Sequence, residues 1–265
     1  MATSSALIKV MSDAARKAAR GLVRDFGELE NLQVTRKGLA DFVSQADTKA
    51  EAIITEELAR ARPGYSFVGE EQGEIGGTDK THRWIVDPLD GTTNFLHAIP
   101  QFAINIALER EGAIVAGVTY NPISNDLFWA EKGKGAFLNN DVRLRVSGRR
   151  NLDEALLATG IPFLGHGQHG KFLKELHQLT QRVAGVRRIG AASLDLAWVA
   201  AGRFDGYWER ELKPWDMAAG ILLVTEAGGK VTNADGADTM LTSGSILAAN
   251  LDLHPQVLER LKAAA

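Results

Sequence analysis

The sequence predicts a layered α/β protein, and two patterns carry this prediction. Residues 102–138 contain four short apolar runs joined by tight turns, which is typical of a meander in a mostly antiparallel sheet. From about residue 150 onward, strand-like and helix-like runs alternate, which indicates a sheet covered by helices. No flexible linker separates these parts, so we expect one compact unit with an N-terminal half, 1–145, and a C-terminal half, 146–265.

The N-terminal half is expected to begin with two helices on either side of a strand. Apolar residues recur at helical spacing between Ala6 and Ala18, which predicts an amphipathic first helix. Residues 45–62 predict a second helix, ended by Pro63-Gly64. Strands are expected at 31–35, 65–69, 83–86, 102–108, 113–120, 126–130 and 135–138, with a polar, glycine-rich loop at 71–81.

The C-terminal half is expected to follow a basic, polar segment at 143–151, which is the predicted seam between the halves. Its apolar runs are separated by turn residues and change between strand and helix periodicity. Strands are expected at 155–159, 186–189, 204–209, 230–233 and 245–249, and helices at 169–183, 191–201, 215–227 and 254–263.

Composition excludes several classes of function. The chain has 265 residues, 45% apolar content and a formal net charge of −3, so it can bury a large core and has no overall attraction to nucleic acid or anionic membranes. It has no cysteine, which excludes disulfides, thiolate catalysis and cysteine metal sites. Charges interrupt the apolar residues of segment 1–23, and no apolar run reaches the length of a membrane span. We therefore expect a cytoplasmic protein that does not bind membranes.

One segment points to chemistry: residues 84–95, WIVDPLDGTTNF, where an apolar strand runs into two carboxylates, a glycine and two hydroxyls. Asp87 and Asp90 supply hard oxygen ligands, and like charges so close together need a cation such as Mg²⁺. Gly91-Thr92-Thr93 lies where a short helix is expected to begin, so its backbone N–H groups would face an anion. The segment therefore predicts a combined metal and phosphate site.

Three other acidic positions are less specific on spacing alone. Glu70-Glu71 follows a predicted strand and is either a pair of metal ligands or an exposed charged turn. Asp47 lies in the first turn of a predicted helix, and Asp216 follows Lys213-Pro214 at another helix start, where capping explains each of them. The residues alone favour the structural interpretation at all three positions.

Taken together, the segments DPLDGTT at 87–93, GEE at 69–71 and Trp215-Asp216 with Gly228-Gly229 resemble the inositol monophosphatase family. They occur in the family's order and at its separations, and the resemblance runs from about Lys37 to Gly229. It implies a Mg²⁺-dependent phosphomonoesterase, an inositol-phosphate phosphatase with a five-layer αβαβα fold. It also implies inhibition by Li⁺ and a homodimer.

The resemblance implies ligands for two or three Mg²⁺ ions. They are Glu70, Asp87 and the backbone carbonyl of Leu89 for the first ion, Asp87, Asp90 and Asp216 for the second, and Glu71 or Glu70, through water, for a third. Thr92, paired with Asp47, resembles the hydroxyl and carboxylate dyad that orients the attacking water. The N–H groups of Gly91-Thr92-Thr93 would hold the phosphate oxygens, where positive charge is needed because a phosphate dianion repels the nucleophile.

The resemblance also implies a substrate pocket. By resemblance, Gly190-Ala191-Ala192, Glu209 and Asp216 contact the leaving alcohol, and a Glu209 carboxylate that accepts hydrogen bonds from ring hydroxyls favours a polyol such as inositol. The alternative for Glu209 is a solvated charge at the end of a strand. Relatives that act on histidinol phosphate, fructose 1,6-bisphosphate or 3′-phosphoadenosine 5′-phosphate share the metal motifs, so these sister substrates stay open.

Other conspicuous residues have simpler interpretations. His166, His169 and His177 do not have the spacing of a metal triad and are expected at the surface. Arg187-Arg188, with Arg182, forms a basic cluster. Its interpretations, in order of preference, are a solvated face, a subunit interface, and a contact for a second phosphate or RNA. A second class of function is regulation, in which the protein binds RNA or transcription machinery and keeps residual phosphatase activity. The expected core aromatics are Trp84, Trp198 and Trp208.

Overall fold

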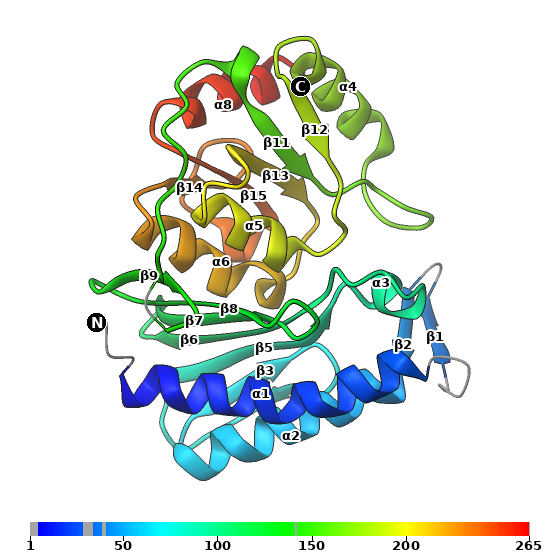
Figure 1. The fold of residues 1–265 in the computed structure, drawn as a ribbon, viewed down its shortest axis with the longest axis vertical. Helices are drawn as coiled ribbons and strands as arrows, with labels where there is room; N and C mark the ends of the chain where they lie inside the picture. Colours follow the sequence, from blue (N-terminus) through cyan, green and yellow to red (C-terminus); the bar gives the residue numbers. More distant parts are fainter. Residues whose placement is uncertain (1–4, 29–33, 39–40, 141, 265) are drawn as a thin grey trace.

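The computed structural model describes residues 5–28, 34–38, 41–140 and 142–264. Its elements stack in five layers, in the order helices, sheet, helices, sheet and helices, as Figure 1 shows. The predicted αβαβα fold is therefore confirmed. None of the helices in the described ranges is long and apolar enough to cross a membrane.

The first layer consists of α1 (Ala6–Gly27) and α2 (Gln45–Ala61). Ser5 caps α1 by accepting a hydrogen bond from the Ile8 N–H at 3.2 Å, and the apolar face of this helix packs into the core of the first sheet. Between the two helices, β1 (Val34–Gly38) and β2 (Asp41–Ser44) form a small antiparallel ribbon. The strand predicted at 31–35 falls partly on β1, and its residues 31–33 lie outside the described residues.

The second layer is an eight-stranded sheet whose pairs are antiparallel except for β3 with β5. In spatial order its strands are β10 (Val142–Arg143), β9 (Gly135–Leu138), β8 (Asp126–Glu131), β7 (Ala113–Asn121), β6 (Ala103–Arg110), β5 (His82–Asp90), β3 (Ser66–Gly69) and β4 (Gly73–Ile75). The meander from β6 to β9 confirms the prediction from residues 102–138. The loop prediction for 71–81 is wrong at β4, an exposed edge strand whose three residues carry no burial alternation.

The third layer contains two helices that are apolar on nearly all sides, α5 (Ala192–Ala200) and α6 (Pro214–Glu226). They lie between the two sheets, which explains why they lack a polar face. Gly117 on β7 permits a close approach of α6 to the first sheet, since a Cβ added there would lie 2.9 Å from Cα of Ala219 on α6. The middle layer thus fixes the two sheets against each other.

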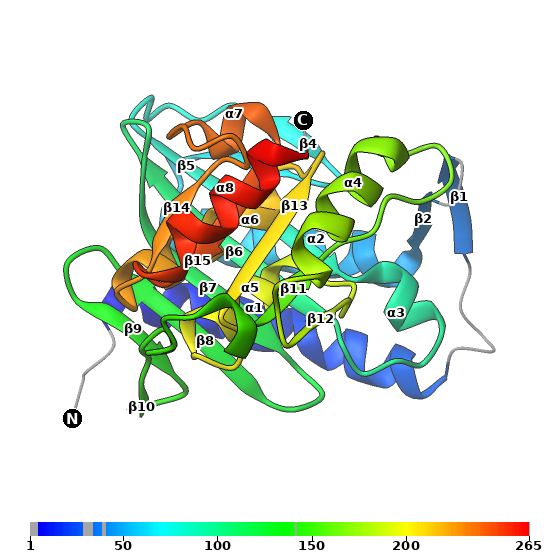
Figure 2. The ribbon, with the colours of Figure 1, turned by 90° about the horizontal axis from the view of Figure 1, so that it is seen from above.

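The fourth layer is a five-stranded sheet in which β11 pairs in parallel with β12 and β13, while β15 pairs antiparallel with β13 and β14. In spatial order its strands are β12 (Gly185–Arg187), β11 (Leu156–Thr159), β13 (Gly206–Arg210), β15 (Ser245–Ala249) and β14 (Lys230–Thr232). The outer helices α4 (His169–Thr180) and α8 (Leu253–Ala263) cover it, as Figure 2 shows from above. The short helices are α3 (Thr92–Leu96), α7 (Met240–Ser243) and the 3₁₀ turn η2 (Leu152–Glu154).

His254 on α8 gives the fold a pH dependence that is independent of the candidate site. Its side chain is fully buried, its Nε2 lies 3.0 Å from the Thr232 hydroxyl, and burial, with the charge of Lys230, lowers its pKa to about 4. The unfolded chain binds a proton below about pH 6.5 and the native state only near pH 4, so stability is lost as the pH falls through this window.

We therefore expect the free energy of unfolding to fall by up to about 2–3 kcal/mol between pH 7 and pH 4 because of His254. Denaturant unfolding of the wild type and of a His254→Gln variant at pH 7.5 and pH 5 measures this. The variant should lose less stability than the wild type on acidification. Equal losses would contradict the assignment.

Candidate active site

The strand β5 carries a bulge between its two predicted metal ligands. Asp87 lies opposite Asn105 of β6 and Asp90 opposite Ala103, so three residue steps on β5 face two on its partner. In a regular strand, residues three apart point to opposite faces, but one extra residue returns them to the same face. Pro88 suits the bulge because it has no N–H to donate to the ladder.

Asp87 is the most buried acid of this segment, with 2% of its surface exposed. Its Oδ1 accepts a hydrogen bond from the Leu89 N–H at 2.9 Å. Burial raises the pKa of Asp87 well above its usual value, and the nearby carboxylates of Glu70, Asp90 and Asp216 raise it further. The fold therefore brings the four predicted acidic ligands into one electrostatic neighbourhood.

Asp90 joins the first sheet to the middle helical layer. Its Oδ2 accepts hydrogen bonds from the N–H and the hydroxyl of Ser193 at 2.7 and 2.5 Å, in the first turn of α5, and the N–H of Ala192 also contributes. Burial raises the pKa of Asp90 to about 6, while these hydrogen bonds oppose the shift. The sequence reasoning missed Ser193, whose only signal was a hydroxyl directly after the predicted small-residue turn.

That small-residue turn, Gly190-Ala191-Ala192, lies against the start of α3. Gly91 has φ of 94°, and a Cβ added there would lie 3.0 Å from the Gln101 carbonyl and 3.3 Å from Cβ of Ala191. Asn94 donates from Nδ2 to the Ile189 carbonyl at 2.9 Å, which holds the two segments together. Glycine at position 91 is therefore required both by the backbone conformation and by the close packing.

Thr92 and Asp47 are in contact, as the resemblance implied. The Thr92 hydroxyl lies 3.1 Å from Oδ1 of Asp47 and 3.1 Å from the carbonyl of Leu89. Asp47 comes from the first turn of α2 and is 1% exposed. Thus the predicted dyad and the predicted carbonyl ligand form one cluster at the end of β5.

The Glu70-Glu71 turn is held by a residue that the sequence analysis did not select. Glu51 on α2 is fully buried and accepts hydrogen bonds from the N–H groups of Glu71 and Gln72 at 3.0 and 2.6 Å. Its carboxylate passes so close to Gly69 that a Cβ there would lie 2.4 Å from Oε2. Because Glu51 looks like any helical glutamate in the sequence, only the tertiary structure reveals this contact.

Asp216 lies in the first turn of α6, where it accepts a hydrogen bond from the Lys213 N–H at 2.7 Å. The predicted capping role is therefore confirmed. Burial raises the pKa of Asp216 well above its usual value, and the charges of Asp90, Glu70 and Glu209 add to this. Asn105 of β6 donates a hydrogen bond from Nδ2 to the Trp215 carbonyl at 2.5 Å, which anchors the start of α6.

Glu209, at the end of β13, is held in place on both sides. The Tyr207 hydroxyl donates to its Oε2, the Gly160 N–H contributes a further hydrogen bond, and any Cβ at Gly160 would overlap the carboxylate. Burial raises the pKa of Glu209 to about 7. Asp195 is 1% exposed, and burial, together with the charge of Glu209, raises its pKa well above its usual value. Glu209 is therefore a positioned acceptor rather than a freely solvated charge.

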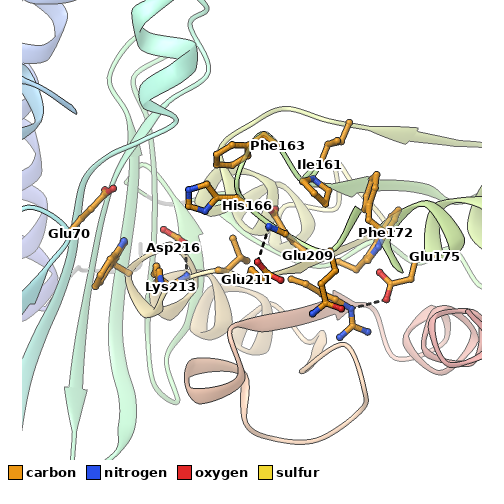
Figure 3. A pocket seen from close by; sticks show the side chains of 18 residues that line it. Glu70, Ile161, Phe163, His166, Phe172, Glu175, Glu209, Glu211, Lys213 and Asp216 are labelled. Atoms are coloured by element: carbon orange, nitrogen blue, oxygen red, sulfur yellow. Dashed lines mark hydrogen bonds and ion pairs between the residues drawn. The ribbon is translucent and has the colours of Figure 1, made fainter. Parts of the chain in front are cut away.

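A cavity of about 370 Å³ opens beside these acids, and Figure 3 shows it from close by. Glu70 and Asp216 lie at one end, and Glu209 lies farther along it. The β11–α4 loop and α4 contribute apolar side chains along it, and the end away from Glu70 holds Phe172 and Glu175. The cavity therefore connects the predicted metal ligands to the predicted substrate contact.

The structure also locates the residues with simpler interpretations. Arg182, Arg187 and Arg188 are exposed, although the charge of Arg188 lowers the pKa of Glu209 and of Asp195. All three histidines of the 166–177 region are exposed as expected, but His166 lines the cavity. Of the predicted core aromatics, Trp84 and Trp208 are buried, and Trp198 is only partly buried.

The acidic residues have the donor chemistry of a Mg²⁺ site, since all of them offer oxygen and they repel one another without a cation. Within the residues that the structure describes, no group of three or more histidine, aspartate or glutamate side chains is already arranged to hold an ion. The assignment of a metal site therefore rests on the like charges of these side chains and on the oxygen donors that they offer.

The layered fold and the acidic cluster at the end of β5 define an α/β protein with a candidate metal site, and comparison with known proteins gives its family. A model of the inositol monophosphatase family matches residues 4–265. The inositol-1-monophosphatase of Caulobacter vibrioides is 70% identical over 256 residues, which cover 96% of this chain and 100% of the relative. The chain belongs to the inositol monophosphatase family and is a phosphatase; the family is generally metal-dependent.

Solved structures agree with this assignment. The extragenic suppressor protein suhB from Bartonella henselae has a TM-score of 0.95 at 56% identity, covering 97% of this chain and 99% of that one. The inositol monophosphatase from Anabaena has a TM-score of 0.84 at 36% identity, covering 97% and 95%. Among the relatives, one from Escherichia coli K12, 41% identical and covering 97% of this chain and 94% of its own, is named Nus factor SuhB.

Proposed function

We propose that this chain is a Mg²⁺-dependent phosphomonoesterase that hydrolyses inositol monophosphate to inositol and phosphate. The observation that carries the proposal is the buried Asp87 carboxylate, whose pKa is raised by burial and by three further acids around it. Without a cation such a cluster is unfavourable, and with one it concentrates positive charge where a phosphate dianion needs it.

Two or three ions are proposed, with ligands from three elements. Glu70, Asp87 and the Leu89 carbonyl would hold the first, Asp87, Asp90 and Asp216 the second, and Glu71 or Glu70, through water, the third. When bound, Mg²⁺ neutralises phosphate charge and lowers the pKa of water. The proximity of Glu70, Asp90 and Asp216 to Asp87 supports this assignment.

The chain's own residues would direct the attack. The Thr92 hydroxyl, 3.1 Å from Asp47, would orient the attacking water, and the Asp47 carboxylate would accept its proton through that hydroxyl. Glu70, at one end of the cavity, is proposed to act beside this dyad. The backbone N–H groups of Gly91-Thr92-Thr93 would hold the phosphate oxygens with little rearrangement.

Glu51 should tune the metal site through the turn that it holds. A Glu51→Gln variant keeps the side-chain size but gives up one acceptor and the charge, so the Glu70-Glu71 turn loses a hydrogen bond. We expect about 10–100-fold more Mg²⁺ to be needed for half-maximal phosphate release, with kcat at saturation little changed. Glu56→Gln, on the exposed side of α2, is the matched control. An unchanged Mg²⁺ requirement would contradict the role of Glu51.

Glu209 supports a polyol as the leaving alcohol. It is held by Tyr207 and Gly160 with its carboxylate at the cavity, and the turn Gly190-Ala191-Ala192 and Asp216 complete the proposed contacts. A fixed carboxylate accepts hydrogen bonds from ring hydroxyls. Among inositol 1-phosphate, histidinol phosphate, fructose 1,6-bisphosphate and 3′-phosphoadenosine 5′-phosphate, we therefore expect the highest kcat/KM for the inositol ester.

In a Glu209→Gln variant, kcat/KM for inositol 1-phosphate should fall about 10–100-fold, since a hydrogen bond to a charged acceptor contributes about 1.5–3 kcal/mol. Hydrolysis of phenyl phosphate, which has no ring hydroxyl, should stay within about threefold of wild type. In a Tyr207→Phe variant, kcat/KM for each of the two substrates should change in the same direction as in Glu209→Gln, but by a smaller factor. Equal loss on both substrates would indicate general damage to the site and refute the polyol contact.

A regulatory function is the second candidate, and the relatives named Nus factor favour it. Binding of purified RNA polymerase or RNA by the wild type and by a catalytically inactive variant tests it. Equal binding by both proteins would establish a role independent of turnover, and absence of binding would remove this candidate.

Within the main proposal, a homodimer, inhibition by Li⁺ and a cytoplasmic location remain predictions.

A further inference from the structure

A row of polar side chains crosses the first sheet next to the start of α6. Asp87 on β5 lies directly opposite Asn105 on β6, and Asn105 lies directly opposite Thr119 on β7. Residues directly opposite each other in an antiparallel pair point to the same face of the sheet, so these three side chains share one face. All three residues are buried, with exposed fractions of 2%, 1% and 0%.

The neighbouring row on the same face is apolar and small. Two residues away along each strand, Ile85 lies opposite Ala107, and Ala107 lies opposite Gly117. The helix α6 packs against this row through Ala218 and Ala219. Small side chains let the helix come close, but apolar contact has no direction and does not fix the exact place of the helix start. Hydrogen bonds from the polar row have a direction and can fix it.

Two hydrogen bonds connect the polar row to α6. The Thr119 hydroxyl donates to Oδ1 of Asn105 at 2.7 Å, and Nδ2 of Asn105 donates to the Trp215 carbonyl at 2.5 Å. Because a carbonyl only accepts, the second bond turns the Nδ2 end of the amide toward the helix, and the Oδ1 end then needs a donor, which Thr119 supplies. Loss of either partner would leave a buried polar group unpaired.

This chain of bonds connects two proposed ligands of the second ion. Asn105 is the ladder partner of Asp87, and Trp215 directly precedes Asp216. Asp87 lies on β5 and Asp216 on α6, in different layers, and the charge of Asp216 acts on Asp87. The separation of the two carboxylates therefore depends on where the start of α6 lies against the sheet, and the Asn105 side chain sets that place.

We propose that Asn105 and Thr119 are positioning residues for the second Mg²⁺ ion. Asn105 holds the start of α6 so that Asp216 meets Asp87 at the ion, and Thr119 acts through Asn105 by orienting its amide. Neither side chain is proposed to touch the ion or the substrate. This inference rests on the proposed phosphatase function and deepens it.

Calorimetric binding of Mg²⁺ in the absence of substrate tests this role without relying on turnover. Thr119→Val keeps the shape of the side chain and removes the hydroxyl. It should weaken Mg²⁺ binding about 3–10-fold, below the range usual for a residue that bonds to the ligand itself. Thr119→Ser keeps the hydroxyl and should bind Mg²⁺ within about twofold of the wild type. Equal affinities of the valine and serine variants would overturn the proposal.

A double-mutant cycle separates positioning from general damage. Asn105→Ala should weaken Mg²⁺ binding about 10-fold. Adding Thr119→Val to it should change the affinity by less than about twofold, because Thr119 has no effect once Asn105 is gone. Losses that multiply in the double variant would show two independent effects and overturn the proposal.

Asn250→Ala is the matched control. Asn250 is also a buried asparagine, 4% exposed, and its Nδ2 donates to the carbonyls of Ser147 and Arg149 at 3.0 and 2.8 Å. It follows β15 at the end of that strand remote from Glu209. This variant should unfold at a lower denaturant concentration and bind Mg²⁺ as the wild type does. A loss of Mg²⁺ affinity equal to that of Asn105→Ala would overturn the proposal.

The same measurements separate failure of this inference from failure of the proposed function. If the wild type binds Mg²⁺ and releases phosphate, and the Asn105 and Thr119 variants bind Mg²⁺ equally well, the positioning role is wrong and the phosphatase proposal stands. If the wild type binds no Mg²⁺, the metal-dependent function fails, and the positioning role fails with it.

Discussion

Replacing Asp87 with asparagine should lower Mg²⁺-dependent phosphate release about 10³-fold or more and, in EDTA, should make the protein more stable. The loss follows because Asp87 is proposed to contact two ions, which supply several kcal/mol of stabilisation to the transition state. The gain follows from the raised pKa of Asp87. An unfolded chain releases this proton near pH 4, so at pH 7.5 the raised native pKa destabilises the metal-free protein, and asparagine removes that penalty.

Paired measurements make this prediction specific. Thermal unfolding in EDTA should shift upward by roughly 2–4 °C for each kcal/mol recovered, and added Mg²⁺ should stabilise the wild type but not the variant. Asp205→Asn is the matched control, because Asp205, directly before β13, is equally buried but is paired with Arg149 and the Leu156 N–H. That control should lose stability and keep activity. Lower stability of Asp87→Asn in EDTA would contradict the metal assignment.

Removing the hydroxyl of Thr92 should lower kcat about 10²–10³-fold, the range expected when a positioned proton-transfer group is lost. Thr92→Val keeps the shape of the side chain and leaves Asp47 without the hydroxyl 3.1 Å from its Oδ1. Because this hydroxyl is proposed to orient water rather than to bind substrate, KM and the Mg²⁺ concentration for half-maximal rate should change little. Steady-state kinetics at several Mg²⁺ concentrations measure all three quantities.

Thr92→Ser is the control for this prediction, since it keeps the hydroxyl. Its kcat should stay within about tenfold of wild type. If Thr92→Val raised KM and left kcat unchanged, the hydroxyl would act in substrate binding, and the dyad with Asp47 would not direct the attack.

The sequence was sufficient for the main features of the fold. The turns between residues 102 and 138 predicted the meander from β6 to β9, and the alternating periodicity after residue 150 predicted the second sheet with its helices. It was not sufficient for β4 and β10, because short exposed edge strands show neither apolar runs nor alternation. The parallel pairing of β3 with β5 depends on a crossover that local patterns do not encode.

The candidate site divides in the same way. Asp87, Asp90 and Thr92 were found because one short segment carries them, and the resemblance added Glu70, Asp47 and Asp216. Their supports were missed because they come from distant segments. Glu51 resembles a solvated helical glutamate, Tyr207 a core aromatic and Ser193 an ordinary residue of a helical first turn, and only the fold brings their polar atoms to the acids they hold.

The apolar residues that line the cavity were missed for a different reason. Ile161 and Phe163 lie in a glycine-rich segment, which sequence patterns assign to a surface loop, and their alignment with Phe172 depends on how α4 docks on β13. Sequence reasoning can therefore identify a reactive motif more readily than the residues that line the cavity beside it.

The proposed role of the acidic cluster is tested most directly by release of phosphate from inositol 1-phosphate by the purified chain, measured in Mg²⁺, in excess EDTA, and after Mg²⁺ is restored. We expect release in Mg²⁺, loss in EDTA and recovery when the ion is returned. Release that continues unchanged in EDTA, or no release in Mg²⁺, would contradict the claim that the acidic cluster around Asp87 holds the ions that drive hydrolysis.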